Sequence, residues 1–318
     1  MGQERWVIAT VVLALTFVLP AALCGGVMFV PATSAIGLAA VCLSAALGMT
    51  IVVLVNWWEF TNRWLRGAWI VAFGAVMAQR LRQASVLRTI SEDRPVAVAA
   101  AVFSGIGIWL LVDILAARRH PGDALELRSP LRVGRFLITD GGDGARSFLV
   151  NYHYGFGRHR SSGANASMRY AMDIVEIGFF GGESHGFLPR SNDAYRIWNR
   201  PLLAPCDGRV VHVVNDVLDN AAFGSHRPYG VGNHVVIRKD DDVYVVLGHM
   251  RQGSVTVGAG DMVRAGSPIG RVGNSGWTER PHLHMQAMRS AEGDWWHGEP
   301  LPIRFGGRFL VRNQVLRA

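Results

Sequence analysis

Cysteine and lysine are both scarce in this chain of 318 residues. Of its three cysteines, Cys24 and Cys42 lie in long apolar runs and Cys206 stands alone in the rest of the chain. A disulfide framework and a cysteine-type zinc site are therefore excluded. Lys239 is the only lysine, so arginine supplies nearly all of the positive charge.

The chain also lacks any run rich in lysine and arginine, and it has no interleaved platform of aromatic residues. Nucleic acid is therefore not the expected partner. The formal net charge is nonetheless +8. We expect an anionic surface, such as membrane headgroups or a cell-wall polymer, to be the partner instead.

Apolar residues concentrate in the first 117 positions, in three long runs. Trp6–Val30, Ser34–Val55 and Val96–Ala117 are each long enough to cross a bilayer as a helix. The first run is too long for a secretory signal peptide, and a second run follows it almost at once. We therefore predict a membrane domain over residues 1–117, with spans at about 6–30, 34–56 and 96–117.

Residues 67–79 leave the number of spans open. This stretch is apolar but short, and arginines bracket it, which favours a helix lying in the membrane interface over a short fourth span. The positive-inside rule places the arginine-rich loop Glu59–Arg94 in the cytoplasm and, with three spans, the C-terminal part on the opposite side. Arg118 and Arg119 argue against this orientation. We predict a multi-pass protein of the cytoplasmic membrane whose C-terminal domain lies outside the cytoplasm, on the periplasmic or cell-wall side.

The composition changes after Arg119. Residues 118–124 form a short linker, and residues 125–318 are rich in glycine, proline and β-branched side chains. Short strand-like runs recur between turn signals and no long helix-period segment stands out, which predicts an all-β, mainly antiparallel domain. The long excursion Gly182–Asn199 contains no pattern that predicts a function. The expected strands are Phe136–Thr139, Ser147–Val150, Arg209–Val214, His234–Arg238, Val243–Leu247, Ser254–Val257 and Ile269–Val272.

Two histidines near the C-terminus form the clearest candidate site. His282 and His284 are separated by one residue, and side chains in a β-strand alternate faces with a period of two. Both imidazoles therefore project to one side, while Leu283, Met285 and Ala287 form an apolar row on the other. Such a pair provides half of a metal site, although two histidines at this spacing also occur by chance.

Four further residues are candidates for the same chemistry. Asp173 lies between apolar neighbours and is either an exposed turn residue or an oxygen ligand to a metal. His249 ends an apolar strand, where a lone histidine is usually structural. His153 follows an expected strand, and His159 lies in a loop flanked by arginines.

Taken together, the soluble half resembles a known family from about Leu127 to Phe309. Its segments follow the family order, and they end with the intact sequences Gly-Asn-Ser-Gly and Pro-His-Leu-His. The order is more specific than any single segment. The matching segments are Leu203–Val210, Gly232–Ile237, Tyr244–Met250, Val257–Gly266 and Gly273–His284. The family is that of the lysostaphin/LytM-type zinc endopeptidases (metallopeptidase family 23), which cut peptide cross-links of peptidoglycan.

This resemblance implies a LytM-type (duplicated hybrid motif) fold and a zinc ion held by Asp173 and His284. Most members supply the third ligand four residues before the aspartate, but that position is Arg169, which cannot bind zinc. A subset of the family has an earlier histidine, which corresponds to His153, with His159 as the alternative.

The resemblance also implies a reaction and roles for two further histidines. His282 and His249 would flank the attacking water, one as general base and the other as a donor to the oxyanion. The implied substrate is the peptide of peptidoglycan. The alternative is a catalytically weak module of LytM type that binds the wall or activates a separate hydrolase. The sequence names no regulatory membrane partner.

Overall fold

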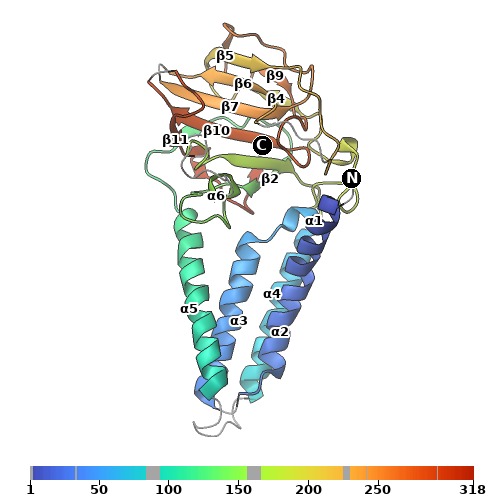
Figure 1. Cartoon of the computed structure of the whole chain (residues 1–318), viewed down its shortest axis with the longest axis vertical. Helices are drawn as coiled ribbons and strands as arrows, with labels where there is room; N and C mark the ends of the chain where they lie inside the picture. The colour runs from blue at the N-terminus through green and yellow to red at the C-terminus, as the bar shows by residue number, and fades with distance from the viewer. Residues whose placement is uncertain are drawn as a thin grey trace. The chain divides into compact units, whose positions relative to one another are not determined.

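The computed structural model describes residues 3–32, 34–83, 94–155, 166–224, 230–240, 242–291 and 293–318. Within these residues the chain forms two compact units (Figure 1). One is Trp6–Leu115, called here the helical unit. The other contains Ala116–Ala318 and is called the β unit.

The helical unit contains the apolar helices that the sequence predicts. The first begins as α1 (Gln3–Leu13), passes through a π-helical turn (Ala14–Val18) and continues as α2 (Leu19–Phe29). α3 (Ala35–Val55), a 3-10 turn (Trp58–Phe60), α4 (Arg63–Arg82) and α5 (Arg94–Ala117) follow. Among the described residues, three helices are long and apolar enough to cross a membrane. They are Arg5–Phe29, Ala35–Val55 and Arg94–Ala117.

Residues 67–79 belong to α4, which packs against α2 and α3. Phe73 of α4 is buried in a cluster with Val27 and Leu38. Near the end of α4, Arg80 donates from Nη2 to the carbonyl of Val30, at 3.1 Å. The C-terminal end of α4 therefore lies beside the C-terminal end of α2. α4 also packs against α3. α4 is not among the three helices that are long and apolar enough to cross a membrane, and the number of spans stays a prediction.

The β unit is built on one mainly antiparallel sheet (Figure 1). Nine of its described strands form this sheet, in the order β14-β2-β3-β10-β7-β6-β5-β8, with β11 also paired to β10. The bounds are β2 Arg135–Asp140, β3 Met172–Glu176, β5 Gly208–Val214, β6 Asn233–Arg238, β7 Val243–Met250, β8 Met262–Val263, β10 Leu283–Arg289, β11 Glu299–Leu301 and β14 Val315–Arg317.

Two smaller sheets and two short helices complete the β unit. The expected all-β, mainly antiparallel architecture is confirmed, but two expected strands are wrong. Ser147–Val150 is a turn because Ser147 and Val150 donate to Asp143 and Ser147, and Ser254–Val257 is irregular. The smaller elements are β1 (Leu125–Leu127), β12 (Ile303–Phe305) and β13 (Arg308–Phe309), then β4 (Pro201–Leu203) with β9 (Pro268–Arg271), then α6 (Tyr152–Gly155) and a 3-10 turn at Asn192–Ala194.

The two faces of the main sheet have different roles. Leu283, Met285 and Ala287 of β10 lie in the hydrophobic core, as the alternation predicts. The residues between them, His284 and Gln286, therefore point to the opposite face. That face carries the candidate site.

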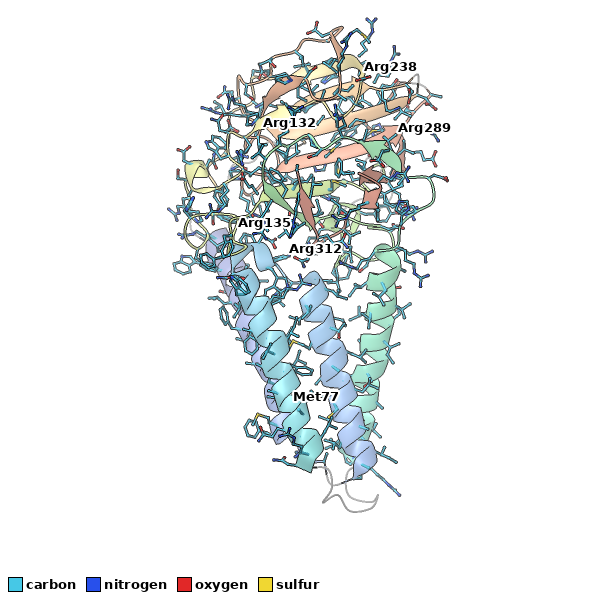
Figure 2. The ribbon with its side chains drawn as sticks, turned by 180° about the vertical axis from the view of Figure 1, so that it is seen from behind. Met77, Arg132, Arg135, Arg238, Arg289 and Arg312 are labelled. Carbon is cyan, nitrogen blue, oxygen red and sulfur yellow. The ribbon has the colours of Figure 1, made fainter. Side chains whose placement is uncertain are left out.

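The positive charge of the β unit is dispersed. Arg238 and Arg289 lie at the ends of β6 and β10, and Arg132 and Arg135 lie before and at the start of β2 (Figure 2). Arg312 differs from them because its side chain is only 2% exposed. Its guanidinium contacts the candidate site described below.

Candidate metal centre

Strand pairing brings Asp173 and His284 together. The two residues lie directly opposite each other in the antiparallel strands β3 and β10. Side chains of such a pair share one face and approach closely. His284 Nδ1 lies 3.1 Å from Asp173 Oδ1.

His153 reaches the same carboxylate from the short helix α6. Its Nε2 lies 3.2 Å from Asp173 Oδ1. Asn151 orients the residue, because its side-chain oxygen accepts from the His153 backbone N–H at 3.1 Å and lies 3.0 Å from Nδ1. Because Nδ1 is bonded to Asn151, Nε2 is the ring nitrogen directed at Asp173.

Asp140 and Arg312 stand behind His153. Asp140 Oδ2 lies 3.8 Å from His153 Nδ1, and Asp140 Oδ1 accepts from the Tyr152 backbone N–H at 2.8 Å. Arg312 Nη1 is 3.5 Å from Asp140 Oδ1, and its guanidinium lies over the Tyr152 ring. Burial raises the pKa of Asp140 to about 6, against the lowering effect of His153 and Arg312. The sequence contains no local signal for this contact because Arg312 is 172 residues away from Asp140.

His153, Asp173 and His284 have the donor set and spacing of a zinc site. Each offers one ligand atom, and these atoms all lie within 4.8 Å of one another. Zinc binds imidazole nitrogen and carboxylate oxygen at about 2.0–2.2 Å in a tetrahedral arrangement, so the three residues fit it.

Gln286 fixes the second nitrogen of His284. Its side-chain oxygen lies 3.0 Å from His284 Nε2, which leaves Nδ1 as the ring nitrogen directed at Asp173. Hydrogen bonds of this kind orient metal ligands in proteins. The period-two alternation places Gln286 on the same face as His284, but a lone glutamine carries no further signal of this role in the sequence.

The sequence left two candidates for the third zinc ligand, His153 and His159. His159 lies outside the described residues. Arg169, which occupies the usual family position of the ligand, forms a bidentate ion pair with Asp143, at 2.7 Å from Nε and 2.6 Å from Nη2. Among the described residues, His153 is the histidine that joins Asp173 and His284.

His282 faces the second oxygen of the same carboxylate. Its Nε2 lies 3.3 Å from Asp173 Oδ2. Its Nδ1 lies 2.9 Å from the carbonyl of Arg280 and 3.1 Å from the Thr278 hydroxyl. The carbonyl of Arg280 can only accept, so Nδ1 carries a proton, and Nε2 is the ring nitrogen directed at Asp173.

His249 reaches the site through an irregularity at the end of β7. Strand alternation would direct it away from His284, because its neighbour Gly248 is the residue opposite His284. However, the register of β6 and β7 shifts between Asn233 and Val235, and His249 has a φ of 55°. Bulges of this type redirect side chains next to active sites. The His249 ring lies 4.8 Å from that of His282 and 5.6 Å from that of His284, centroid to centroid.

The charges of the site are strongly coupled. Burial disfavours the charged form of Asp173, but His153 and His282 outweigh it and hold the pKa of this carboxyl well below its usual range. Burial lowers the pKa of His153, but Asp173 outweighs it and raises that pKa to about 9. Burial, with the neighbouring His282 and His284, holds the pKa of His249 well below 6.5. His249 is therefore neutral at physiological pH, and its Nδ1 donates to the carbonyl of Ser275 at 2.8 Å.

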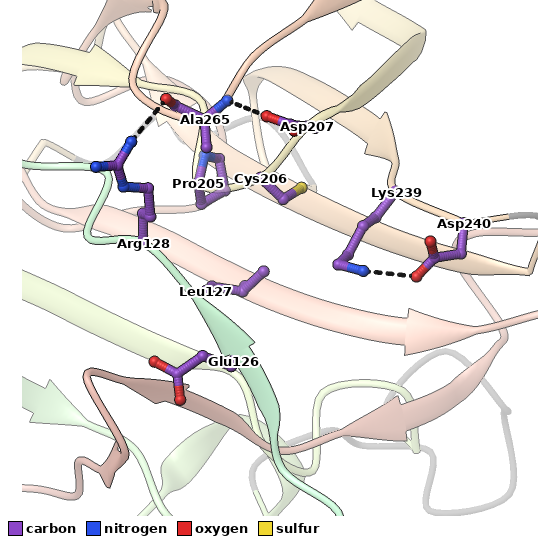
Figure 3. Close-up of a pocket in the computed structure, with 9 residues that line it drawn as sticks. All are labelled: Glu126, Leu127, Arg128, Pro205, Cys206, Asp207, Lys239, Asp240 and Ala265. Carbon is purple, nitrogen blue, oxygen red and sulfur yellow. Dashed lines mark hydrogen bonds and ion pairs between the residues drawn. The ribbon is translucent and has the colours of Figure 1, made fainter.

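A separate pocket of about 470 Å³ has a different character (Figure 3). Among its charged groups, Lys239 Nζ lies 2.6 Å from Asp240 Oδ2, and Glu126 pairs with Arg304 outside the lining. Burial raises the pKa of the lining thiol, Cys206, to about 12, which makes it a poor nucleophile. None of the nine residues that line this pocket is a histidine.

Comparison with known proteins identifies the β unit. Residues 195–295 match the model of Peptidase family M23. This region includes His249, His282 and His284, and both His153 and Asp173 precede it.

Two characterised relatives match over 139 residues, which is 44% of the chain. Glycyl-glycine endopeptidase ALE-1 of Staphylococcus capitis is 27% identical, and lysostaphin of Staphylococcus simulans is 34% identical. The match covers 34% of ALE-1 and 25% of lysostaphin, so the chain spans about a third of the first relative and a quarter of the second.

Two solved structures are also similar. The catalytic domain of the prophage-encoded M23 protein EnpA from Enterococcus faecalis is 22% identical, with a TM-score of 0.28 over 41% of this chain and 72% of that chain. A zinc containing peptidase from Vibrio cholerae is 18% identical, with a TM-score of 0.32 over 56% of this chain and 39% of that chain. From the family match and the two sequence relatives, this chain contains a peptidase family M23 domain, homologous to ALE-1 and lysostaphin.

Proposed function

We propose that this protein is a membrane-anchored zinc metalloendopeptidase that hydrolyses peptide cross-links of peptidoglycan. The observation that carries the proposal is the arrangement of five side chains in an M23 domain. His153, Asp173 and His284 have the donor atoms and spacing for zinc, and His249 and His282 stand beside them.

His153, Asp173 and His284 would hold the ion. When bound, zinc would supply a Lewis acid that makes water a stronger acid and polarises the scissile carbonyl. The chain contributes orientation: the contacts with Asn151 and Gln286 direct His153 Nε2 and His284 Nδ1 at Asp173, so these are the nitrogens that would bind the ion.

His249 and His282 would take part in proton transfer from the attacking water. Both donate from Nδ1 to a backbone carbonyl, so Nε2 is the nitrogen that each would use to exchange a proton with water. The histidine that becomes protonated can then donate to the oxyanion or to the leaving amine. Asp173 Oδ2, at 3.3 Å, stabilises positive charge on His282.

We expect the purified full-length chain in detergent to contain about one zinc per chain and to release new amino groups from purified peptidoglycan. Amine labelling after digestion identifies the bond that is cut. A glycine bridge and a direct cross-link should be compared, because ALE-1 is named as a glycyl-glycine endopeptidase. Zinc-loaded protein that binds peptidoglycan and releases no amine would support the non-catalytic binding module instead.

Access to peptidoglycan requires the β unit to lie outside the cytoplasm. A reporter fused after Ala318 should therefore be active only on the outer side. If α4 is a fourth span, a reporter at the N-terminus should lie on that same side. An N-terminal reporter in the cytoplasm would support the three-span topology, and a cytoplasmic signal after Ala318 would remove the proposed substrate from reach.

A further inference from the structure

The excursion Gly182–Asn199, for which the sequence predicted no function, is an ordered part of the β unit. Its two arms pair: Ser184 bridges Tyr195, and the Arg196 backbone N–H donates to the Glu183 carbonyl at 3.0 Å. Leu188, Tyr195 and Ile197 are buried. Its first thirteen residues, 182–194, precede the region that matches the M23 family model.

Glu183 connects this excursion to the segment that carries His282. The Glu183 side chain is 1% exposed, and its Oε1 lies 2.7 Å from Arg280 Nε, whose side chain is 14% exposed. A carboxylate is buried to this extent at a large desolvation cost, which is offset only when a partner lies in a well-defined geometry. The ion pair therefore fixes where Arg280 lies.

Arg280 is in turn the residue whose backbone orients the catalytic candidate. Its carbonyl lies 2.9 Å from His282 Nδ1 and accepts from the Thr278 hydroxyl at 2.8 Å. A displacement of Arg280 would move the acceptor that keeps Nδ1 protonated and Nε2 directed at Asp173.

A second contact joins the excursion to the same turn. The Asn192 side-chain oxygen accepts from Asn274 Nδ2 at 3.1 Å, and the Asn274 side-chain oxygen lies 3.0 Å from the Thr278 hydroxyl oxygen. Thr278 also lies 3.1 Å from His282 Nδ1. Two sets of contacts therefore lead from the excursion to the two groups beside His282 Nδ1, the Arg280 carbonyl and the Thr278 hydroxyl.

We propose that the excursion Gly182–Asn199 is a positioning element for His282, acting through the Glu183–Arg280 ion pair and the Asn192–Asn274 hydrogen bond. This inference rests on the proposed hydrolysis. Glu183 and Asn192 touch no reacting atom. Their role is to hold the Arg280 carbonyl in place at Nδ1 of the His282 imidazole, on the side of the ring away from Asp173.

The test is Glu183→Gln in the zinc-loaded full-length chain, since the amide keeps the size of the carboxylate and removes its charge. We expect kcat for cross-link cleavage to fall about 10-fold, with KM and zinc content unchanged, as for other residues that orient a site group from behind. In the His282→Ala background the same substitution should have no further effect. An unchanged kcat, or the same fractional loss in both backgrounds, overturns the inference.

A spectroscopic measurement separates this inference from the proposed function. In the metal-free chain labelled with nitrogen-15 histidine, the His282 ring resonances, identified by their loss in His282→Ala, should shift in Glu183→Gln. Unshifted resonances overturn the inference. If the wild-type chain cleaves no peptidoglycan, the proposed function fails and this measurement still decides the positioning role.

Glu176→Gln is the matched control. Glu176 forms a partly buried ion pair with Arg200 in the same unit. It should change neither kcat nor the His282 resonances. Asn192→Ala removes the second contact with a smaller perturbation, and the same outcomes decide the inference if Glu183→Gln does not fold.

Discussion

His284→Ala is expected to lose bound zinc and to reduce cross-link cleavage at least about 10³-fold. His284 Nδ1 lies opposite Asp173 Oδ1 in the strand register, and its loss leaves two of the three proposed protein ligands. A catalytic metal supplies several kcal/mol of transition-state stabilisation, and about 4 kcal/mol corresponds to 10³-fold in rate. Asp173→Ala should have the same effect, because its Oδ1 lies within 3.1–3.2 Å of both histidine nitrogens.

Zinc content by elemental analysis after gel filtration is the direct measurement, and activity is measured on the same samples. His234→Ala is the matched control, because His234 is also a buried histidine of the main sheet and hydrogen-bonds to His212 and the Gly232 carbonyl. It should keep its zinc. Zinc at wild-type occupancy in His284→Ala would contradict the assignment of this ligand.

The variant His153→Ala tests whether His153 is the third zinc ligand, which is the ligand that the sequence left open. It should lose zinc like His284→Ala, since Nε2 of His153 faces Asp173 at 3.2 Å. Arg169→Gln should keep zinc, because the guanidinium is bonded to Asp143. If His153→Ala retains the metal, His159 becomes the third ligand.

Much of this site could be predicted because it depends on local patterns. The period-two alternation in β10 separates His284 from the core residues Leu283 and Met285, and the structure keeps that division. The antiparallel pairing of β3 with β10 then places Asp173 directly opposite His284, so a single strand register brings these two residues together. The apolar helices are equally local, since length and composition define them.

The rest depends on contacts that no local pattern encodes. His249 faces the site because a bulge and a positive φ redirect it, whereas plain alternation would send it away. His153 is 20 residues from Asp173 in the sequence, and its distance to the carboxylate is set by how α6 packs. Glu183 and Arg280 are 97 residues apart, so neither charge indicates its partner. Ser147–Val150 has the apolar residues of a strand, but hydrogen bonds to Asp143 turn it.

His282→Ala is expected to keep its zinc and to lose about 10²- to 10⁴-fold in kcat, the usual contribution of a general acid–base group. His282 is not one of the three side chains whose donor atoms cluster, so its removal leaves them in place. Its Nε2 nevertheless lies 3.3 Å from Asp173 Oδ2, at the edge of that cluster, with Nδ1 held by the Arg280 carbonyl. The imidazole is therefore placed to exchange a proton beside the ligands.

The measurement is kcat and zinc content on the same preparation, with His297→Ala as control, since that exposed histidine pairs only with the nearby Asp294 among the contacts described here. His249→Ala gives the comparison with the second histidine. The loss of His249, which is neutral in the folded protein, should lower kcat at every pH and leave the zinc content unchanged. Zinc loss in His282→Ala would instead make His282 part of the metal-binding set, and unchanged turnover would remove it from the reaction.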